Sequence, residues 1–83
     1  MEKSKIGGDI MNNVEMTPVS SSDVAELGYD EPNQVVYVRF LDDGLYIYKG
    51  VPQYEYERLL YASSIGSYLY RNIKNVYPYE RIE

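Results

Sequence analysis

The chain has 83 residues, lacks cysteine, histidine and tryptophan, and carries a formal net charge of −5 at pH 7. These absences exclude disulfides and thiolate zinc sites and remove the usual catalytic bases and nucleophiles, while the acidic balance disfavours sequence-independent binding of a polyanion. Tyrosine occurs 11 times, and its ring and hydroxyl suit cores, interfaces and base-stacking surfaces, so the composition predicts a small binding module and not an enzyme.

No part of the chain looks like a membrane or export segment. Apolar runs stay far below the roughly 20 residues that cross a bilayer, and the first residues lack the apolar core of a signal peptide. We therefore expect a cytoplasmic protein that does not contact a membrane. We expect no cofactor.

The N-terminal residues 1–15 show no apolar periodicity and contain Gly7–Gly8 and Asn12–Asn13. They are expected to form a flexible tail before a single domain at residues 16–83. Residues 7–11 can be encoded as a purine-rich ribosome-binding sequence followed by a start codon. Two interpretations stay open: translation starts at Met11 in a bacterial or phage gene, or the segment is an ordinary leader.

Three strands are expected next, at residues 24–29, 35–41 and 45–50. The first ends at the turn Asp30–Asn33, because proline and asparagine favour turn geometry. The second is rich in β-branched and aromatic residues. Asp42–Gly44 closes a hairpin between the second and third strands.

The length of this hairpin loop decides the register. A three-residue loop with Gly44 in the left-handed region sets Phe40 opposite Tyr46. A two-residue loop would shift the pairing by one residue and send Tyr46 and Tyr48 to the other face. We favour the three-residue loop, since glycine stands where a positive φ is required.

This register gives the sheet two largely apolar faces. The first face carries Val36, Val38, Phe40, Tyr46 and Tyr48. The second carries Val35, Tyr37, Leu41, Leu45 and Ile47, together with Arg39 and Lys49. A single helical layer covers only one face, so the second is either half-covered by the tail or meets a partner.

A helical period follows Val51–Pro52, where proline suits a first turn. Ser63–Ser64 end this helix and cap a second one. The second helix carries an apolar stripe of Ile65, Leu69, Ile73 and Val76. Tyr77–Pro78 ends it, because a residue before proline avoids helical geometry. The fold class is α+β: a three-stranded antiparallel meander followed by two short helices packed on one face, in the order βββαα.

Four ordered segments of the chain resemble a known family. They are Val19–Ser22, Tyr46–Pro52, Ser64–Leu69 and Asn72–Lys74. Over about residues 18–78 the chain resembles a KTSC domain, a family named for its place at the C-terminus of some lysyl-tRNA synthetases and also found as free-standing small proteins of bacteria and phages. The resemblance implies RNA binding, a suggestion that follows from the synthetase association.

The outer face of the second helix is the best candidate for a ligand site. Its tyrosine and basic side chains, with two basic residues expected nearby, form a small patch suited to RNA or a nucleotide. The candidate residues are Lys49, Arg58, Ser67, Tyr70, Arg71 and Lys74. The alternative is a solvated charged face. Gly66 either lets a phosphate approach backbone amides or permits close packing of the two helices.

A second function of a different class stays open. The second sheet face is too apolar for solvent, so it is a candidate interface for a homodimer or a protein partner. Its proposed contact residues are Val35, Tyr37, Leu41 and Ile47. A third hypothesis is a phage accessory protein that acts on a host partner or on a signalling nucleotide. Asp42–Asp43 falls short of a calcium loop, so no metal site is expected.

Overall fold

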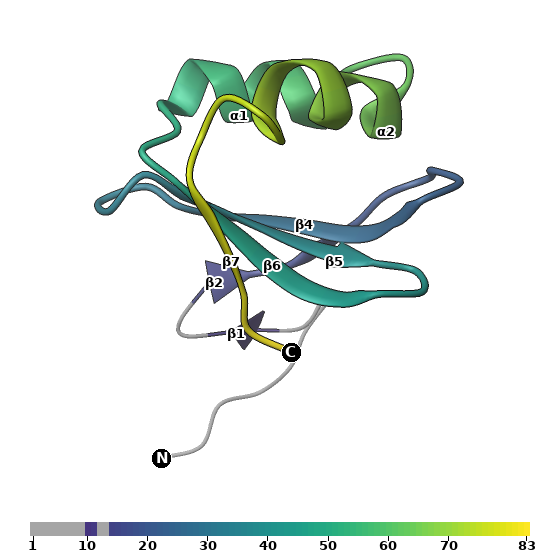
Figure 1. Cartoon of the computed structure of the whole chain (residues 1–83), viewed down its shortest axis with the longest axis horizontal. Helices are drawn as coiled ribbons and strands as arrows, with labels where there is room; N and C mark the ends of the chain where they lie inside the picture. Colours follow the sequence, from purple (N-terminus) through teal and green to yellow (C-terminus); the bar gives the residue numbers. More distant parts are fainter. Residues whose placement is uncertain (1–9, 12–13) are drawn as a thin grey trace.

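The computed structural model describes residues 10–11 and 14–83. Residues 1–9 and 12–13 of the expected tail lie outside the described residues. A five-stranded antiparallel sheet has the order β3-β4-β5-β6-β7. The helices cover one face of this sheet, and the short pair β1–β2 lies on the other side (Figure 1). The elements are β1 (Ile10–Met11), β2 (Val14–Glu15), β3 (Thr17–Pro18), β4 (Val24–Asp30), β5 (Val35–Phe40), β6 (Gly44–Lys49), α1 (Gln53–Leu60), α2 (Ile65–Tyr68), the π-type turn η1 (Leu69–Ile73) and β7 (Tyr79–Arg81).

The α+β class and the helical layer are confirmed, but the sheet is wider than the predicted three strands. β4, β5 and β6 are the expected meander, and β3 and β7 add one strand at each edge. These two edge strands contain 2 and 3 residues, too few to show a period of their own. Proline also stands in β3 and directly before β7, which favours a turn when only the local sequence is read. Within the described residues, no helix is long and apolar enough to span a membrane.

The register of the β5–β6 hairpin differs from the predicted one by two residues. Phe40 pairs with Gly44, and Val38 pairs with Tyr46. The loop does hold three residues, but they are Leu41–Asp43 and not Asp42–Gly44. Because the displacement is an even number of residues, Tyr46 still lies on the face that was predicted for it.

Contacts outside the hairpin explain the displacement. The Leu41 N–H donates to the Asp23 carbonyl oxygen at 2.9 Å, which binds Leu41 to β4. Gly44 has a φ of 85° and lies against the C-terminal residue, so that a Cβ built on it would overlap the Glu83 carbonyl oxygen. The glycine therefore serves the contact with the C-terminal segment as well as the turn. That contact spans almost 40 positions and cannot be read from a local loop rule.

Gly44→Ala is expected to lower the free energy of unfolding by more than Gly50→Ala does. Both glycines have a positive φ, at 85° and 77°, so each alanine should cost roughly 1–2 kcal/mol for backbone conformation. Only at Gly44 would the added carbon also displace Glu83, because nothing lies within 4 Å of a Cβ at Gly50. Urea unfolding of the two variants measures the difference. Equal losses would show that the Glu83 contact contributes nothing.

The main core lies between the sheet and the helices. It contains Val24, Leu27, Val36, Val38, Tyr48, Val51, Leu59, Ile65, Leu69 and Ile73. The second helix begins as predicted, since the Ser64 side chain accepts a hydrogen bond from the Ser67 N–H. Val76 was expected to extend the apolar stripe but is 62% exposed. In η1 the Lys74 N–H donates to the Leu69 carbonyl oxygen at 2.8 Å, and this wider turn breaks the 3.6-residue period before Val76 is reached.

A second, smaller core lies on the opposite face of the sheet. It contains Val14, Met16, Tyr37 and Leu45, with Val35 and Ile47 packed against it. The N-terminal segment supplies half of this core, so the structured domain begins earlier than the predicted boundary at residue 16. Gly28 permits the close packing, because a Cβ there would lie 2.6 Å from the Met16 sulfur. The N-terminal segment thus covers part of this face, which was one of the two alternatives for it.

Candidate functional site

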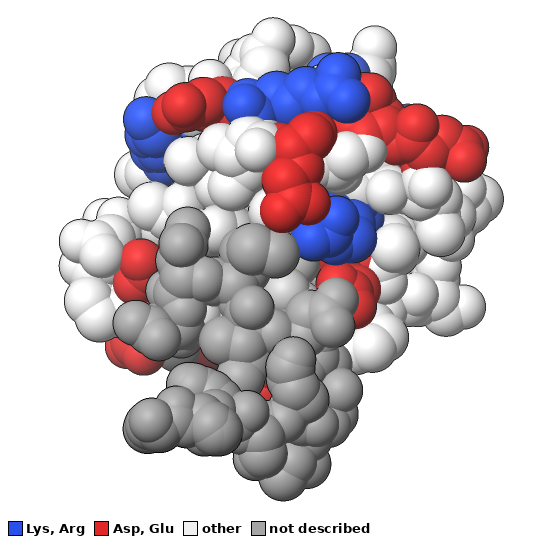
Figure 2. Space-filling model, turned by 90° about the horizontal axis from the view of Figure 1, so that it is seen from below, with Lys and Arg blue, Asp and Glu red and all other residues white. Residues whose placement is uncertain are grey.

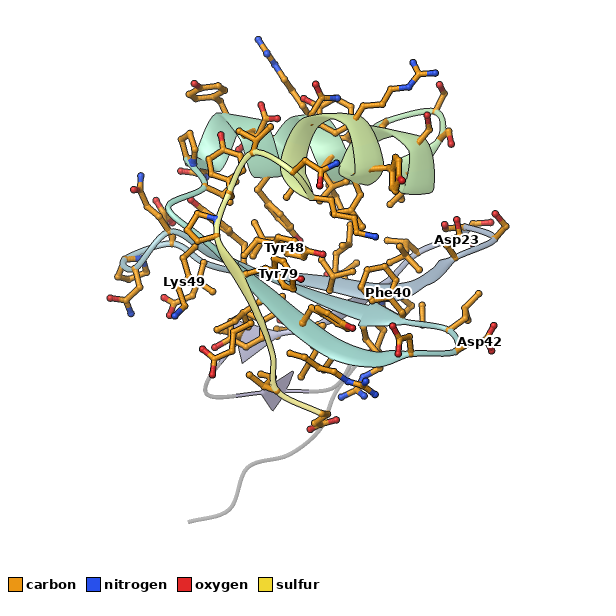
Figure 3. All side chains as sticks on the ribbon, viewed as in Figure 1. Asp23, Phe40, Asp42, Tyr48, Lys49 and Tyr79 are labelled. Carbon is orange, nitrogen blue, oxygen red and sulfur yellow. The ribbon has the colours of Figure 1, made fainter. Side chains whose placement is uncertain are left out.

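A cleft of about 400 Å³ opens between the helical layer and the end of the sheet that carries the β5–β6 loop. Figure 3 shows Phe40, Tyr48 and Tyr79 along the sheet side of this space, with Asp23 and Asp42 toward the loop end. The lining residues come from the position before β4, the β5–β6 hairpin with its loop, the helical segment with the residue that follows it, and β7. They are Asp23, Phe40, Asp42, Asp43, Tyr46, Tyr48, Gly66, Leu69, Tyr70, Lys74 and Tyr79.

Four aromatic rings form a continuous row on the sheet side. The Phe40 and Tyr46 rings meet edge to face, with centroids 5.3 Å apart and planes at 88°. The Tyr79 ring bridges to Tyr46 at 6.0 Å and to Tyr48 at 5.9 Å. Such rows offer flat apolar surface and the negative faces of π systems to a ligand. The expectation that Tyr46 and Tyr48 face the helices is confirmed.

Tyr48 is the buried member of this row. Its side chain is 1% exposed, and burial raises its pKa to about 12, with smaller contributions from Tyr46 and Tyr79. Tyr48 lines the cleft, yet its hydroxyl makes no hydrogen bond to any residue in the described part of the chain. The ring is buried, but the hydroxyl oxygen itself is not among the buried side-chain atoms that lack a partner, so it reaches the surface of the cleft. The Tyr48 hydroxyl is therefore a donor and acceptor that is available to whatever enters the cleft.

The cleft carries more acidic than basic side chains. Among the described residues that line it, three have carboxylates and one, Lys74, has an ammonium group. Asp43 is already engaged, because it accepts from the Tyr46 hydroxyl at 3.1 Å and pairs with Arg81 at 3.5 Å. The carboxylates of Asp23 and Asp42 have no ion pair or hydrogen bond to other described residues. The open rim of the cleft thus carries two unpaired negative charges.

The six residues predicted for a basic patch do not form one surface. Tyr70 and Lys74 lie together at the cleft, with the Lys74 nitrogen 5.0 Å from the centroid of the Tyr70 ring. Ser67 and Arg71 are exposed on the same helical segment but do not line the cleft.

Two basic residues of the predicted patch lie elsewhere. Arg58, on α1, stacks over the Tyr54 ring at 5.4 Å. Lys49, at the end of β6, pairs with Glu80 at 3.3 Å. The Tyr54–Arg58 contact has the four-residue spacing of neighbours on one helix, whereas the Lys49–Glu80 pair depends on the unpredicted strand β7.

Three of the four predicted interface residues belong to the second core or pack against it. Tyr37 is 6% exposed, and Val35 and Ile47 are partly buried against the same core. Leu41 belongs to the hairpin loop and is 53% exposed. On this side of the molecule, basic and acidic side chains are interspersed and form no single basic area (Figure 2).

Several residues that line the cleft were not predicted from the sequence. Asp23 and Tyr79 reach it from positions that are far apart in sequence, so no local motif joins them. The Asp23 carboxylate lies against Gly66, since its oxygen would be 2.9 Å from a Cβ at this position, a contact that neither explanation of this glycine included. Glu55 is also buried and accepts from the Tyr68 hydroxyl at 3.2 Å.

Raising the pH from 10 to 12 is expected to lower the free energy of unfolding. Burial raises the pKa of Tyr48 and of Tyr56 to about 12, whereas tyrosines of the unfolded chain ionise near 10. The stabilisation from these neutral rings is complete below pH 10 and is lost as the pH rises through 12. Urea unfolding at several pH values measures the slope. Tyr48→Phe should show a shallower loss, and an unchanged slope would contradict this origin.

These features define a small α+β domain with a twisted antiparallel sheet, a helical layer on one face and a ligand-sized cleft between them. Residues 20–77 match the family model of the KTSC domain, so the chain belongs to the KTSC domain family and the resemblance seen in the sequence is confirmed. Among solved structures, a KTSC domain protein from Yersinia pestis has a TM-score of 0.82 and 31% identity, covering 84% of this chain and 99% of that one.

Two sequence relatives cover much of the same region. An uncharacterised protein of Stutzerimonas stutzeri is 36% identical over 66 residues, which are 78% of this chain and 93% of the relative. A protein of Tsukamurella paurometabola is 37% identical over 54 residues, which are 65% of this chain and 81% of the relative. Both similarities support the family and its fold.

Proposed function

We propose that this KTSC domain is a small non-enzymatic binding module that takes part of its ligand into the aromatic cleft. The observation that carries the proposal is Tyr48, a buried residue whose hydroxyl lines the cleft without a partner among the described residues. The hydroxyl reaches the surface of the cleft, so a ligand that bonds to it replaces water there, and such a hydrogen bond contributes about 0.5–1.5 kcal/mol net. The row of aromatic rings supplies apolar contact beside it.

The position of the cleft also supports a binding role. η1, a π-type turn, carries Tyr70 and is followed directly by Lys74, and both residues line the cleft. Such turns store some strain in a helix and often occur at functional sites. Lys74, whose nitrogen lies 5.0 Å from the Tyr70 ring, stands at the helical rim. The helical segment thus contributes exposed side chains to one side of the cleft, and the sheet forms the other side.

A nucleotide or the end of an RNA strand is the second candidate ligand. The specific observation in its favour is the Tyr70–Lys74 contact, which places a stacking ring beside an ammonium, with Arg71 exposed next to them. Stacking of a base on the Tyr70 ring and one contact to a phosphate would then both contribute to the affinity. The support is weaker than for a cationic or neutral ligand, because Asp23 and Asp42 repel a phosphate at the same opening.

Binding to the cleft is tested by titrating the ¹⁵N-labelled domain with a panel of blocked amino acids and nucleoside monophosphates. We expect at least one probe to shift the backbone amide signals of Tyr46, Tyr48, Gly66 and Leu69 in a saturable way. Signals of Tyr37 and Leu45 on the second core serve as the internal control and should stay unchanged. Shifts confined to the second core, or no saturable shift with any probe, would contradict the proposal.

A further inference from the structure

We infer that the group bound in the cleft is a lysine or arginine side chain from an extended segment of a partner protein, which pairs with the free edge of β7. This inference rests on the proposed function and names the ligand's chemistry. It is carried by three separate features of the described residues: the charge of the rim, the aromatic row with its unpartnered Tyr48 hydroxyl, and the position of an edge strand beside the opening.

The charge at the rim of the cleft favours a cationic ligand. Asp23 and Asp42 are unpaired among the described residues, whereas Asp43 is already neutralised by Arg81 at 3.5 Å. Among the described residues of the lining, Lys74 is the only basic one. The opening therefore keeps an excess of negative charge in a chain whose net charge is already −5. A cationic side chain is attracted to such a site, and a phosphate is repelled.

The aromatic row suits the same cation. An ammonium or guanidinium group is attracted to the face of a tyrosine ring, and its methylene stem packs on apolar surface. Tyr46 and Tyr79 present adjacent rings with centroids 6.0 Å apart. The protein already uses this interaction beside the cleft, because Arg81 lies 5.9 Å above the Tyr46 ring. The unpartnered Tyr48 hydroxyl can accept a hydrogen bond from the N–H groups of the incoming cation.

A strand edge lies next to this opening. β7 is the last strand in the order of the sheet. In the part of the chain that the structure describes, it pairs with β6 alone, through Tyr48–Tyr79 and Tyr46–Arg81. The Pro78 carbonyl oxygen accepts from Lys49, and the Ile82 N–H donates to Leu45.

Because alternate residues of an antiparallel strand point their backbone groups to the same neighbour, Tyr79 and Arg81 direct theirs away from β6. An extended peptide can therefore add a strand to β7, and its side chains on the helical side of the sheet then lie beside Tyr79 at the cleft. Strand addition supplies main-chain hydrogen bonds, and the side-chain pocket supplies selectivity.

The test uses three probes with the full ¹⁵N-labelled chain: a blocked pentapeptide with a central lysine between threonine and valine residues, the same peptide with Nε-acetyl-lysine, and adenosine monophosphate. We expect the lysine peptide to shift amide signals of both Tyr48 and Tyr79. Acetylation removes the charge and should weaken binding about tenfold. Affinity for the lysine peptide should also fall as salt rises, because the rim carboxylates are exposed.

Substitutions of exposed charged residues test the inference without disturbing the core of the fold. Asp42→Asn should lower the affinity for the lysine peptide about threefold. Lys74→Gln should raise that affinity, because the substitution removes the competing cation. Glu31→Gln is the matched control: it makes the same charge change in the exposed β4–β5 turn, away from the cleft, and should leave the affinity unchanged.

The outcomes separate this inference from the proposed function. If the acetylated peptide binds as well as the lysine peptide, or if adenosine monophosphate binds in the cleft and the lysine peptide does not, the inference is overturned while the cleft stands as a ligand site. If no probe shifts the cleft signals, both are overturned. Binding of the lysine peptide that leaves Tyr79 unaffected would reject pairing with β7.

Discussion

Replacing Met16 by alanine is expected to lower the free energy of unfolding by about 2–5 kcal/mol, the usual cost of removing a large apolar side chain from a packed core. Met16 is 0% exposed and packs with Val14, Tyr37 and Leu45 in the second core. A domain of this size has a stability on the order of 5 kcal/mol, so the variant should be close to unfolding. Urea denaturation followed by far-ultraviolet circular dichroism measures the loss.

Thr17→Ala is the matched control for this prediction. Thr17 is the next residue in the chain and is exposed, so its substitution should change the stability by less than about 0.5 kcal/mol. Equal, small effects at both positions would show that the N-terminal segment is a loosely attached tail, as residues 1–15 were expected to be from the sequence. A large effect at Met16 alone would establish residues 14–16 as an integral part of the fold.

Tyr48→Ala is expected to cost about 3–5 kcal/mol, by analogy with other buried aromatic residues. Tyr48 is the largest fully buried side chain, and it joins the sheet to the helical layer. Tyr48→Phe removes only the hydroxyl, which has no partner among the described residues, so it should leave the stability almost unchanged or raise it slightly. Thermal and urea unfolding of both variants measure these effects.

The phenylalanine variant also separates structure from function at this position. It should fold as well as the wild-type domain and yet bind a cleft ligand several-fold more weakly, because the ligand loses its hydrogen bond to the hydroxyl. A clear loss of stability in Tyr48→Phe would instead mean that the hydroxyl has a structural partner. In that event the main support for the cleft as a binding site disappears.

Local sequence patterns predicted the middle of the domain well. The alternation of apolar residues in β5 and β6 placed Val36, Val38 and Tyr48 on the helical side, and all three are buried in the main core. The serine cap at Ser64 marked the start of the second helix. These features depend on neighbours within one or two turns or one hairpin, and local propensity and periodicity report such neighbours directly.

The parts that were missed depend on contacts between distant segments. β7 forms because Tyr79–Arg81 pairs with β6, more than 30 positions earlier, and three residues carry too little periodicity to predict a strand. The hairpin register follows from Glu83 as much as from the loop. The same reason explains the scattered basic patch, since Lys49 is held by Glu80 in the unpredicted strand.

The segments that flank the family match contribute to both sites of interest. The match spans residues 20–77, while β2 and β3 precede it and β7 follows it. β2 and the adjoining Met16 supply the second core, and β7 supplies Tyr79 to the cleft. The fold of the family thus provides the sheet and the helical layer, and the flanking strands of this chain complete one wall of the proposed binding site.

The most direct measurement of the central claim is a set of intermolecular nuclear Overhauser effects between the lysine peptide and the domain. If the cleft binds a cationic side chain, the ε-methylene protons of the peptide's lysine should give cross-peaks to ring protons of Tyr46, Tyr48 and Tyr79, the tyrosines on the sheet side of the cleft. Cross-peaks only to rings outside the cleft, such as Tyr54 or Tyr61 on the outer side of the helical layer, would contradict it.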